Sequence, residues 1–517
     1  MSTSLRFHYT TAVAFSALPV VDGDTLGACV RQLLDDGWRL LALFGLPQSD
    51  KKRAVSLCCV LAHDASSELA ALRTEPLHNF ISLTPSCPQA HLFERELFEQ
   101  WGITPEGHPW LKPVRCIPDA AEAQARESAQ EHAAVQTIPP PFRFYRVQGE
   151  EVHEVAVGPV HAGVIEPGHF RFQCYGENVL HLEVALGYQH RGIEAMLRNG
   201  PRARCLPVLE CTAGDTSVGH ATAHCVLLER LTGIVVPERS QLLRRIGLEL
   251  ERLANHTGDL GAIGGDTGFL PTSAWNGRIR GDFLNLTAAL CGNRFGRGLL
   301  TPGGAAYDLS SEECADITSR LRAAGRDARG AVDVMLHAPS VLERCTGVGA
   351  LDAKTARDLG LVGVAARACG LERDARRSAP LSCLPSEAWA PRCQQAGDVL
   401  ARALVRSHEL DDSLRMVEED LATLATMPDK AILAPDASKA KANLPPNMLV
   451  VAQVEGWRGE ICHVAITNDT GQFLAYKVID PSFHNWPGLA VALRGNQISD
   501  FPLCNKSFNL SYCGHDL

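Results

Sequence analysis

Residues 448–486 read MLVVAQVEGWRGEICHVAITNDTGQFLAYKVIDPSFHNW and alternate apolar runs with short polar segments. The apolar runs are rich in β-branched and aromatic residues, which favours strands over Met448–Val454, His463–Thr467 and Phe473–Val478. Two polar segments, 455–460 and 480–486, contain the Gly and Pro residues typical of loops, and loops often carry function. The stretch therefore predicts strands near the C-terminal end, separated by candidate site loops.

The part of the chain before this stretch has mostly helical periodicity. We expect helices over Ser217–Leu231, Pro237–Leu260, Ser310–Leu336 and Gln394–Leu424. The first of these follows Asp215 and Thr216, which are good N-cap types, and precedes Gly233, a good C-cap type. Strands are expected over Phe142–Val147, Val155–Val157 and His169–Phe172. Residues 142–517 are therefore predicted to form a large, mainly helical domain with peripheral β-strands.

The N-terminal residues 1–116 have the pattern of a small α/β domain. Helices are expected over Asp24–Asp36 and His91–Trp101, and strands over Trp38–Phe44 and Arg53–Leu61. Residues 117–141 are rich in Ala, Glu and Gln and end in Pro139-Pro140-Pro141, a composition typical of a linker. The predicted fold class is thus α+β, with two domains joined by a linker.

Composition excludes several classes of protein. The chain has 517 residues, of which 45% are hydrophobic and 21% charged, with a net charge of -10, so we expect a globular protein that does not bind nucleic acid. Its apolar runs are shorter than the ~18 residues that a membrane-spanning helix needs, and Thr11–Val21 predicts a buried strand rather than an export signal. The 18 cysteines contain no Cys-x-x-Cys pair, which argues against a zinc ribbon or a ferredoxin-type cluster in this chain.

Five motifs resemble one family. They are Gly158-Pro159-Val160-His161-Ala162-Gly163, Ile165-Glu166-Pro167-Gly168-His169-Phe170-Arg171, Gly187-Tyr188-Gln189-His190-Arg191-Gly192-Ile193-Glu194, Trp457-Arg458-Gly459-Glu460 and Asp480-Pro481. In this order they resemble the large subunit of [NiFe] hydrogenases, especially the energy-converting group, and the 49 kDa subunit of respiratory complex I. The N-terminal domain resembles the 30 kDa subunit of complex I through Glu94-Arg95-Glu96-Leu97-Phe98, Gly102-Ile103 and Glu106-Gly107-His108-Pro109. Fusion of the two units in this order resembles the formate hydrogenlyase large subunit and the hydrogenase-4 component G type.

The chain departs from this family at the metal ligands. The family binds nickel and iron through two Cys-x-x-Cys pairs, which fall here on Ala213 and Thr216 and on Ser482 and Asn485. Thiolates are soft anionic ligands, and neither an alanine, an amide nor a neutral hydroxyl can replace one that bridges two metals. We therefore expect no metal and no cofactor in this chain.

The quinone ligands of complex I are also missing. The position that the resemblance assigns to the quinone-binding histidine holds Ile165, and the matching stretch 201–225 contains no tyrosine. A nicotinamide site is not expected either, because no Gly-x-Gly-x-x-Gly follows a predicted strand.

Polar residues around the lost ligands remain. The resemblance places Glu166 where hydrogenases pass protons and Arg458 where their site arginine lies, with His220 and Asp215 flanking the ligand positions. We expect these four residues to converge in one cavity, with Glu166 buried near Arg458, where they could carry protons. An ion-paired network that only fills the cavity is the alternative. His220 and His224 are spaced as a zinc pair on one helix face, but no third ligand is evident.

The resemblance implies a subunit of a membrane-associated complex I-like or formate hydrogenlyase-like oxidoreductase, which takes part in electron transfer or in its coupling to proton movement. The implied partners are a small iron–sulfur subunit like the 20 kDa subunit of complex I, a ferredoxin-like subunit and antiporter-like membrane subunits, with iron–sulfur clusters in the partners. The implied location is the inner face of the cell membrane. A non-catalytic scaffold is the alternative. An active [NiFe] hydrogenase or a catalytic NADH:quinone oxidoreductase subunit is disfavoured by the missing ligands.

Overall fold

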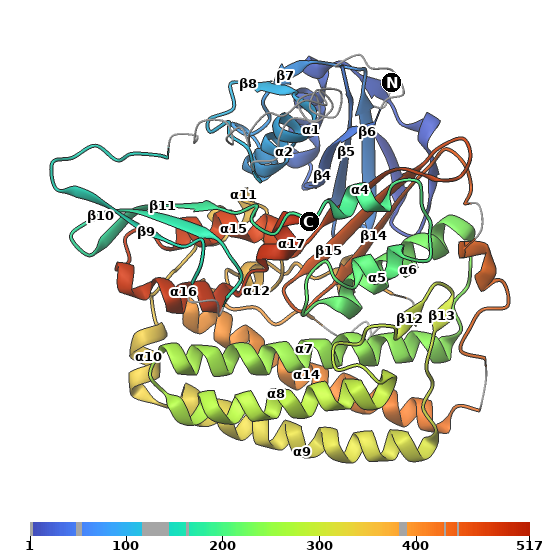
Figure 1. The fold of residues 1–517 in the computed structure, drawn as a ribbon, viewed down its shortest axis with the longest axis vertical. Helices are drawn as coiled ribbons and strands as arrows, with labels where there is room; N and C mark the ends of the chain where they lie inside the picture. Colours follow the sequence, from blue (N-terminus) through green and yellow to red (C-terminus); the bar gives the residue numbers. More distant parts are fainter. Residues whose placement is uncertain are drawn as a thin grey trace, which may run out of the picture.

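The computed structural model describes residues 4–47, 54–115, 144–161, 165–381, 390–428, 431–441 and 444–517. Figure 1 shows three levels, with the N-terminal unit at the top, the sheet that contains β14 and β15 in the middle and a layer of long helices below. Helices and strands are both well represented, as the predicted α+β class requires. The predicted linker 117–141 lies outside the described residues, and the domain boundaries at 116 and 142 stay a prediction.

The N-terminal unit is a sheet covered by two helices. Its elements are β1 (Leu5–His8), β2 (Val13–Ala14), β3 (Val20–Val21), α1 (Gly23–Asp35), β4 (Arg39–Leu46), β5 (Ser56–His63), β6 (Glu68–Thr74), β7 (Asn79–Ile81), α2 (His91–Trp101) and β8 (Thr104–Glu106). The strand order is β1-β6-β5-β4, with β3 parallel to β6. Asp22 accepts a hydrogen bond from the Thr25 amide and so caps α1, and α2 ends at Gly102, whose φ of 65° suits glycine.

This unit shares its core with the C-terminal sheet. Strands β14 (Met448–Glu455), β15 (Glu460–Thr467) and β16 (Phe473–Ile479) form an antiparallel sheet in the order β16-β15-β14-β2, so a strand from the N-terminal unit completes it. One continuous hydrophobic cluster joins residues of β4 and β5 to Val451, Val464 and Phe483. The packing fixes the N-terminal unit directly above the sheet that carries two of the predicted site loops.

The helical layer contains α7 (Glu238–Asp266), α8 (Leu270–Cys291), α9 (Ser311–Leu336) and α14 (Val399–Thr426), which pack along one another at the bottom of Figure 1. Helix α9 begins with a capping box between Ser310 and Glu313. Helix α8 was not expected from the sequence, because Gly277 and Gly281 weaken its helical pattern. Its buried face, which includes Ile279, Phe283 and Leu286, provides the packing that offsets this low propensity.

An arm of three strands extends to the left in Figure 1. It consists of β9 (Val152–Val157), β10 (His169–Tyr175) and β11 (Asn178–Ala185) in the order β11-β10-β9. The strand predicted over 142–147 is wrong where it can be judged, since residues 144–147 are not in a strand. The Tyr145 amide donates to the Glu183 carboxylate instead of to a neighbouring strand, so its backbone hydrogen bond goes to a side chain.

The C-terminal segment after the sheet is helical. Helix α15 (Pro481–Ala492) begins directly after β16, and α16 (Phe501–Phe508) and α17 (Tyr512–Asp516) follow. The predicted loop over 480–486 is therefore wrong beyond its first residue, because Asp480 caps α15 and Pro481 occupies its first turn. The shorter elements are α4 (Ile193–Leu197), α5 (Cys205–Leu209), β12 (Leu300–Thr301), β13 (Gly304–Ala305), α10 (Pro339–Cys345), α11 (Ala353–Asp358), α12 (Gly363–Arg367) and α13 (Ala375–Ser378).

Helix α6 (Ser217–Thr232) lies across β14 and β15 and carries His220 and His224 on the side of the sheet. None of the helices in the described part of the chain combines the length and the apolar character needed to cross a bilayer.

Candidate functional site

The site forms where the loop before α6 meets the turn between β14 and β15. Arg458, on this turn, makes a two-pronged ion pair with Asp215, with nitrogen–oxygen distances of 2.6 and 2.7 Å. Its Nε donates to the carbonyl of Asn509, and its guanidinium lies 4.0 Å from the ring centre of Trp457. Burial opposes ionisation of Asp215, but the Arg458 guanidinium holds the pKa of Asp215 below its usual range. The pair is therefore a fixed carboxylate and cation at the edge of the site.

The position of the first missing thiolate pair is occupied by protein hydrogen bonds. Thr216 Oγ1 donates to Asp215 at 3.1 Å and accepts from the Trp457 indole at 3.1 Å and from Arg458 at 3.2 Å. Ala213 is buried and offers no polar atom. Thr216 thus joins the loop to the turn, and neither side chain offers a thiolate to a metal.

The position of the second pair is occupied in the same way. Ser482 Oγ accepts from the Ser511 amide at 2.8 Å. The Asn485 amide forms two hydrogen bonds, both 3.1 Å long, with the backbone N–H and C=O of Val362. Both side chains are buried and tie α15 to neighbouring segments. The residues present therefore do not fit a nickel–iron centre, which needs anionic sulfur ligands at these positions.

His220 faces the C-terminal sheet rather than a metal. Its Nε2 lies 3.1 Å from Asp480 Oδ2, and its Nδ1 lies 3.1 Å from His463 Nε2. Burial raises the pKa of Asp480, but the hydrogen bond with His220 and the charge of Arg458 together lower it below its usual range. No group of three or more His, Cys, Asp or Glu side chains within the described ranges could hold a metal ion, so the zinc pair of His220 and His224 gains no third ligand.

The expectation that Glu166 is buried is wrong. We expected a buried glutamate beside Arg458, but Glu166 is half-buried, and Arg458 is paired with Asp215. Glu166 accepts a hydrogen bond from the Tyr512 amide at 3.1 Å and contacts the Cys513 thiol. Burial and the nearby Glu166 charge raise the pKa of Cys513 to about 12, so this thiol stays protonated. Of the four predicted residues, Asp215 and Arg458 are in direct contact and His220 lies beside them through Asp480, whereas Glu166 contacts Tyr512 and Cys513.

Glu251 was not predicted and lies beside the site. This α7 residue is buried, and its carboxylate accepts from the amides of Val218 and Gly219 in the first turn of α6, at 2.7 and 3.2 Å. Burial raises the pKa of Glu251 to about 8 despite these two hydrogen bonds. Gly219 lets the first turn of α6 pack against β15, because a Cβ there would lie 2.6 Å from the Ile461 side chain. Nothing in the local sequence distinguishes Glu251 from an ordinary helix-surface glutamate.

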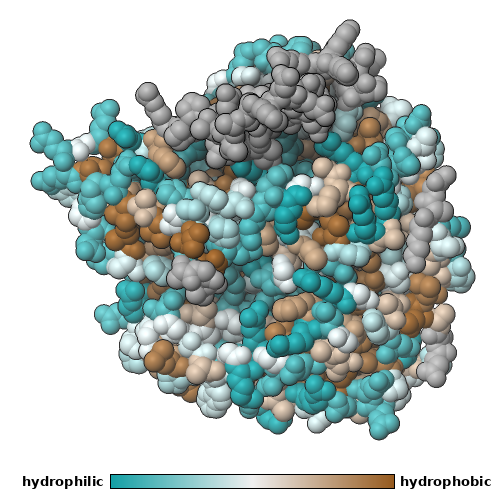
Figure 2. Space-filling model, viewed as in Figure 1, coloured by the Kyte–Doolittle hydropathy of each residue, from teal (hydrophilic) through white to brown (hydrophobic). Residues whose placement is uncertain are grey.

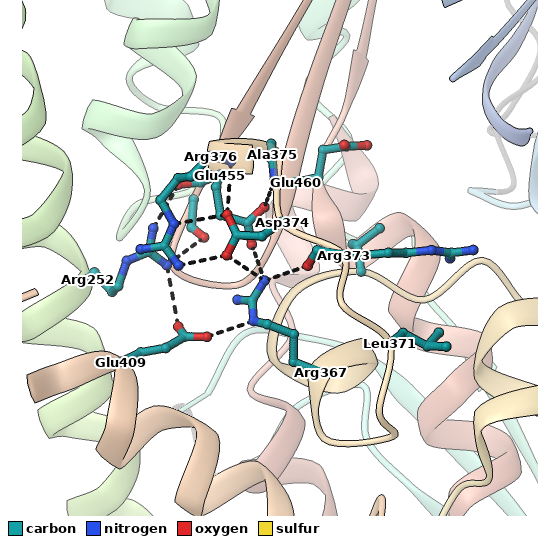
Figure 3. A network of polar contacts seen from close by, with 12 residues as sticks. Arg252, Arg367, Leu371, Arg373, Asp374, Ala375, Arg376, Glu409, Glu455 and Glu460 are labelled. Atoms are coloured by element: carbon teal, nitrogen blue, oxygen red, sulfur yellow. Dashed lines mark hydrogen bonds and ion pairs between the residues drawn. The ribbon is translucent and has the colours of Figure 1, made fainter. Parts of the chain in front are cut away.

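A second polar cluster lies behind the turn that carries Arg458, and Figure 3 shows it. Arg367 pairs with Glu409 and Glu455 at 2.7 Å each and with Asp374 at 3.1 Å. Arg252 donates to the backbone carbonyls of Glu455 and Gly456 and so holds the turn in place. We call this group, with Arg376, the arginine cluster; its guanidiniums and carboxylates neutralise one another in the interior.

The motif at 187–194 ties the chain's last helix to the site. Asp516 accepts hydrogen bonds from the amides of Gly187 and Gln189, and Arg191 donates to the carbonyls of Cys211, Thr212 and Cys513. Arg191 therefore joins the loop before α6 to α17. The motif supports the site and is not a simple exposed turn.

Comparisons with known proteins agree with this architecture. Residues 20–125 match the family described as the 30 kDa subunit of respiratory-chain NADH dehydrogenase, and residues 266–516 match its 49 kDa subunit. Formate hydrogenlyase subunit 5 of Escherichia coli (strain K12) is 29% identical over 491 residues, which cover 92% of this chain and 84% of that protein. A carbon monoxide-induced hydrogenase of Rhodospirillum rubrum is 30% identical over 358 residues, 69% of this chain and 97% of that protein.

A complex I subunit and one chain of a solved membrane complex are also similar to this chain. NADH-quinone oxidoreductase subunit 4 of Thermus thermophilus is 28% identical over 369 residues, 68% of this chain and 90% of that protein. A chain of the membrane-bound sulfane sulfur reductase, an archaeal respiratory membrane complex, has the same fold with a TM-score of 0.65 at 23% identity, covering 72% of this chain and 100% of that chain. The chain belongs to the family of complex I 49 kDa subunits and hydrogenase large subunits, and carries a 30 kDa-type unit before the family's main domain.

Proposed function

We propose that this chain is a subunit of a membrane-associated, complex I-like oxidoreductase complex and works in electron transfer or its coupling to proton movement, without a nickel–iron centre of its own. The observation that carries the proposal is the state of the four ligand positions. Thr216, Ser482 and Asn485 use their polar atoms on protein partners, and Ala213 has none to offer. A chain that keeps the family fold but fills its metal site with hydrogen bonds has a different use for that site.

Proton handling is the use that the site chemistry supports. Asp215 and Asp480 are held ionised by Arg458 and His220, and Glu251, with its pKa raised to about 8, can gain or lose a proton near neutral pH. Glu251 is thus a group that can take up or release a proton at working pH beside two carboxylates that stay charged. No step in this account requires a metal.

We place the chain against other subunits at the inner face of the cell membrane. The relatives' names describe subunits of a formate hydrogenlyase and of an NADH-quinone oxidoreductase, and the similar solved structure is a respiratory membrane complex. This supports a small iron–sulfur subunit, a ferredoxin-like subunit and antiporter-like membrane subunits as partners, with the iron–sulfur clusters in the partners. The arm β9–β11 exposes Val157, Tyr175 and Leu180, and Figure 2 shows hydrophobic side chains gathered in this part of the surface. Such a patch suits contact with another protein.

A scaffold without a role in catalysis is the second candidate, and the arginine cluster favours it. The cluster is largely buried, and arginine does not lose its proton in proteins, so its guanidiniums keep their charge. A chain stabilised in this way could join its partners mechanically without taking part in the chemistry.

Isolation of the intact complex through a tag on this chain tests the proposal. We expect co-purified subunits that carry iron–sulfur clusters, seen by mass spectrometry and electron paramagnetic resonance. In a complex that carries Asp215→Asn we expect normal assembly and electron transfer at least ~10-fold slower, because the amide removes the fixed negative charge beside Glu251 and a positioned proton transfer contributes ~100-fold or more. Asp316→Asn, at an exposed ion pair with Arg320, is the matched control. An assembled Asp215→Asn complex with an unchanged rate would support the scaffold instead.

A further inference from the structure

Five buried polar side chains form an unbroken line from the site into the interior. Asp480 meets His220, His220 meets His463, and His463 Nδ1 lies 3.0 Å from the hydroxyl of Tyr476. The same hydroxyl lies 2.9 Å from His224 Nδ1. Every link is a hydrogen-bond distance of 3.1 Å or less. All five residues are almost fully buried, with exposures from 0% to 4%, so the line is shielded from bulk water.

The fold brings this line together from three elements. His220 and His224 lie one helical turn apart on α6 and face the same sheet. Tyr476 pairs with Ala465 across β15 and β16, and His463 pairs with Val478, so His463 and Tyr476 are diagonal neighbours on one face of the sheet. Asp480 follows β16 and lies at the end of the line nearest Arg458. The one-turn separation on α6 and the diagonal pairing on the sheet therefore bring the five side chains within hydrogen-bond distance of their neighbours in the line.

The hydrogen bonds can be ordered in only one way when Asp480 is ionised and the imidazoles are neutral. His220 then donates from Nε2 to Asp480 and accepts at Nδ1 from His463 Nε2. His463 accepts at Nδ1 from the Tyr476 hydroxyl, which in turn accepts from His224 Nδ1. Burial lowers the pKa of His224 to about 4 and that of His463 well below its usual range, which keeps these two rings neutral. His220, His463 and the Tyr476 hydroxyl therefore each donate one hydrogen bond and accept one.

We propose that this line is a proton wire that delivers a proton from His224, at one end of the line, to the Asp480–His220 pair at the other. Its members are His224, Tyr476, His463, His220 and Asp480. The inference rests on the proposed function and names the path by which that site is supplied. One proton enters at His224 Nε2, each hydrogen bond passes its own proton one step, and the Asp480–His220 pair gains one. No other bond forms or breaks, no electron moves, and every hydrogen bond of the line ends with its direction reversed.

Asp480→Asn imitates the end of the wire after it has received a proton. Asp480 Oδ1 accepts the Ser482 amide in the cap of α15, so an amide oxygen must take that place in Asp480→Asn. The amide nitrogen then faces His220 Nε2 and donates to it, as a protonated carboxyl would. The wire predicts that His220 and His463 change from Nε2–H to Nδ1–H, and that His224 changes from Nδ1–H to Nε2–H.

Nitrogen-15 NMR of the full chain with labelled histidine reads these tautomers directly, with single His→Gln variants used to assign the signals. In the unsubstituted chain we expect protons on Nε2 of His220, on Nε2 of His463 and on Nδ1 of His224; any other set contradicts the wire without requiring a variant to fold. In Asp480→Asn we expect all three to reverse. Unchanged tautomers at His463 and His224 would overturn the proposal, because the change would then stay local.

A rate measurement distinguishes a line that carries protons during turnover from hydrogen bonds that only hold the side chains in place. Tyr476→Phe removes the hydroxyl that joins His463 to His224 and should slow electron transfer by the intact complex at least ~10-fold, while reversal at His224 in the Asp480→Asn background is lost. Tyr9→Phe is the matched control, since the buried Tyr9 hydroxyl donates to the Pro380 carbonyl and lies outside the line. An unchanged rate in Tyr476→Phe would overturn the wire. It would leave the proposed function standing, because that function is tested by Asp215→Asn and by the subunits of the complex.

Discussion

The arginine cluster and the line from Asp480 to His224 are both buried polar groups, and they differ in kind. The arginine cluster consists of guanidiniums and carboxylates, whereas the line from Asp480 to His224 consists of imidazoles and a phenol with one carboxylate at its end. Guanidinium groups keep their charge at any pH that the fold survives, but imidazole and phenol can both give and take a proton. The comparison teaches that buried polar groups can stabilise the fold in one place and transfer protons in another.

Breaking the arginine cluster should cause the largest loss of stability. Arg367→Met would leave Glu409, Glu455 and Asp374 short of a positive charge in the interior, and we expect the free energy of unfolding to fall by about 3–5 kcal/mol. Urea denaturation followed by circular dichroism measures it. Arg320→Met, at the exposed pair with Asp316, is the control and should change stability by less than about 0.5 kcal/mol. A loss below about 1 kcal/mol for Arg367→Met would mean that the cluster does not support the fold.

Glu251 should make stability depend on pH. Its pKa is about 8 in the folded chain and about 4.3 when unfolded, so the folded state holds a proton that the unfolded state has already lost. The stability that this group contributes is therefore complete below about pH 4 and disappears as the pH rises to about 8. We expect Glu251→Gln to gain about 2–4 kcal/mol relative to the unsubstituted chain between pH 5 and 8.5. Parallel pH profiles in urea denaturation would show that Glu251 is ionised in the folded protein.

Removing Arg458 should cost less than removing Arg367. Arg458→Met leaves Asp215 without its partner and raises the pKa of Asp215, but the side chain of Asp215 is 31% exposed, so water replaces part of the lost interaction. We expect a loss of about 1–2 kcal/mol in the free energy of unfolding, measured as above. Arg458→Lys should recover part of it, because lysine restores the charge but not the two-pronged geometry. A loss as large as that of Arg367→Met would remove the contrast between the two regions.

The smallest effect is expected at Glu166. The side chain is half-buried, and the oxygen of a glutamine can accept the same hydrogen bond from the Tyr512 amide. Glu166→Gln should therefore change the free energy of unfolding by less than about 0.5 kcal/mol. A loss above about 1.5 kcal/mol would indicate that Glu166 is held by a stronger interaction than this hydrogen bond.

Local sequence signals predicted the elements better than their contacts. The bounds of α2 agree with the expected helix, and those of α6 differ from it by one residue, because caps and periodicity act within a few residues. The Asp480-Pro481 pair also carried a helix-start signal that its loop-like composition concealed. Helix α8 was missed because its glycines oppose helix formation and only tertiary packing offsets them.

The candidate site depends on pairings between distant residues, which local patterns do not determine. The ion pair of Asp215 with Arg458 joins residues 243 positions apart, and the sequence could equally have paired Arg458 with Glu166. His463 and Tyr476 meet because of the register of β15 and β16. A shift of this register by one residue would place the two side chains on opposite faces of the sheet. The resemblance of the motifs indicated the region, but the hydrogen bonds within it required the structure.

Nickel content tests the central claim most directly, namely that this chain keeps the hydrogenase fold while protein hydrogen bonds fill its metal site. The intact complex, isolated from cells that also make an active nickel–iron enzyme as a positive control, is analysed by inductively coupled plasma mass spectrometry. Because Ala213, Thr216, Ser482 and Asn485 supply no thiolate, the account predicts nickel far below one atom per copy of this chain, with iron explained by the clusters of the partner subunits. One nickel atom per copy would contradict it.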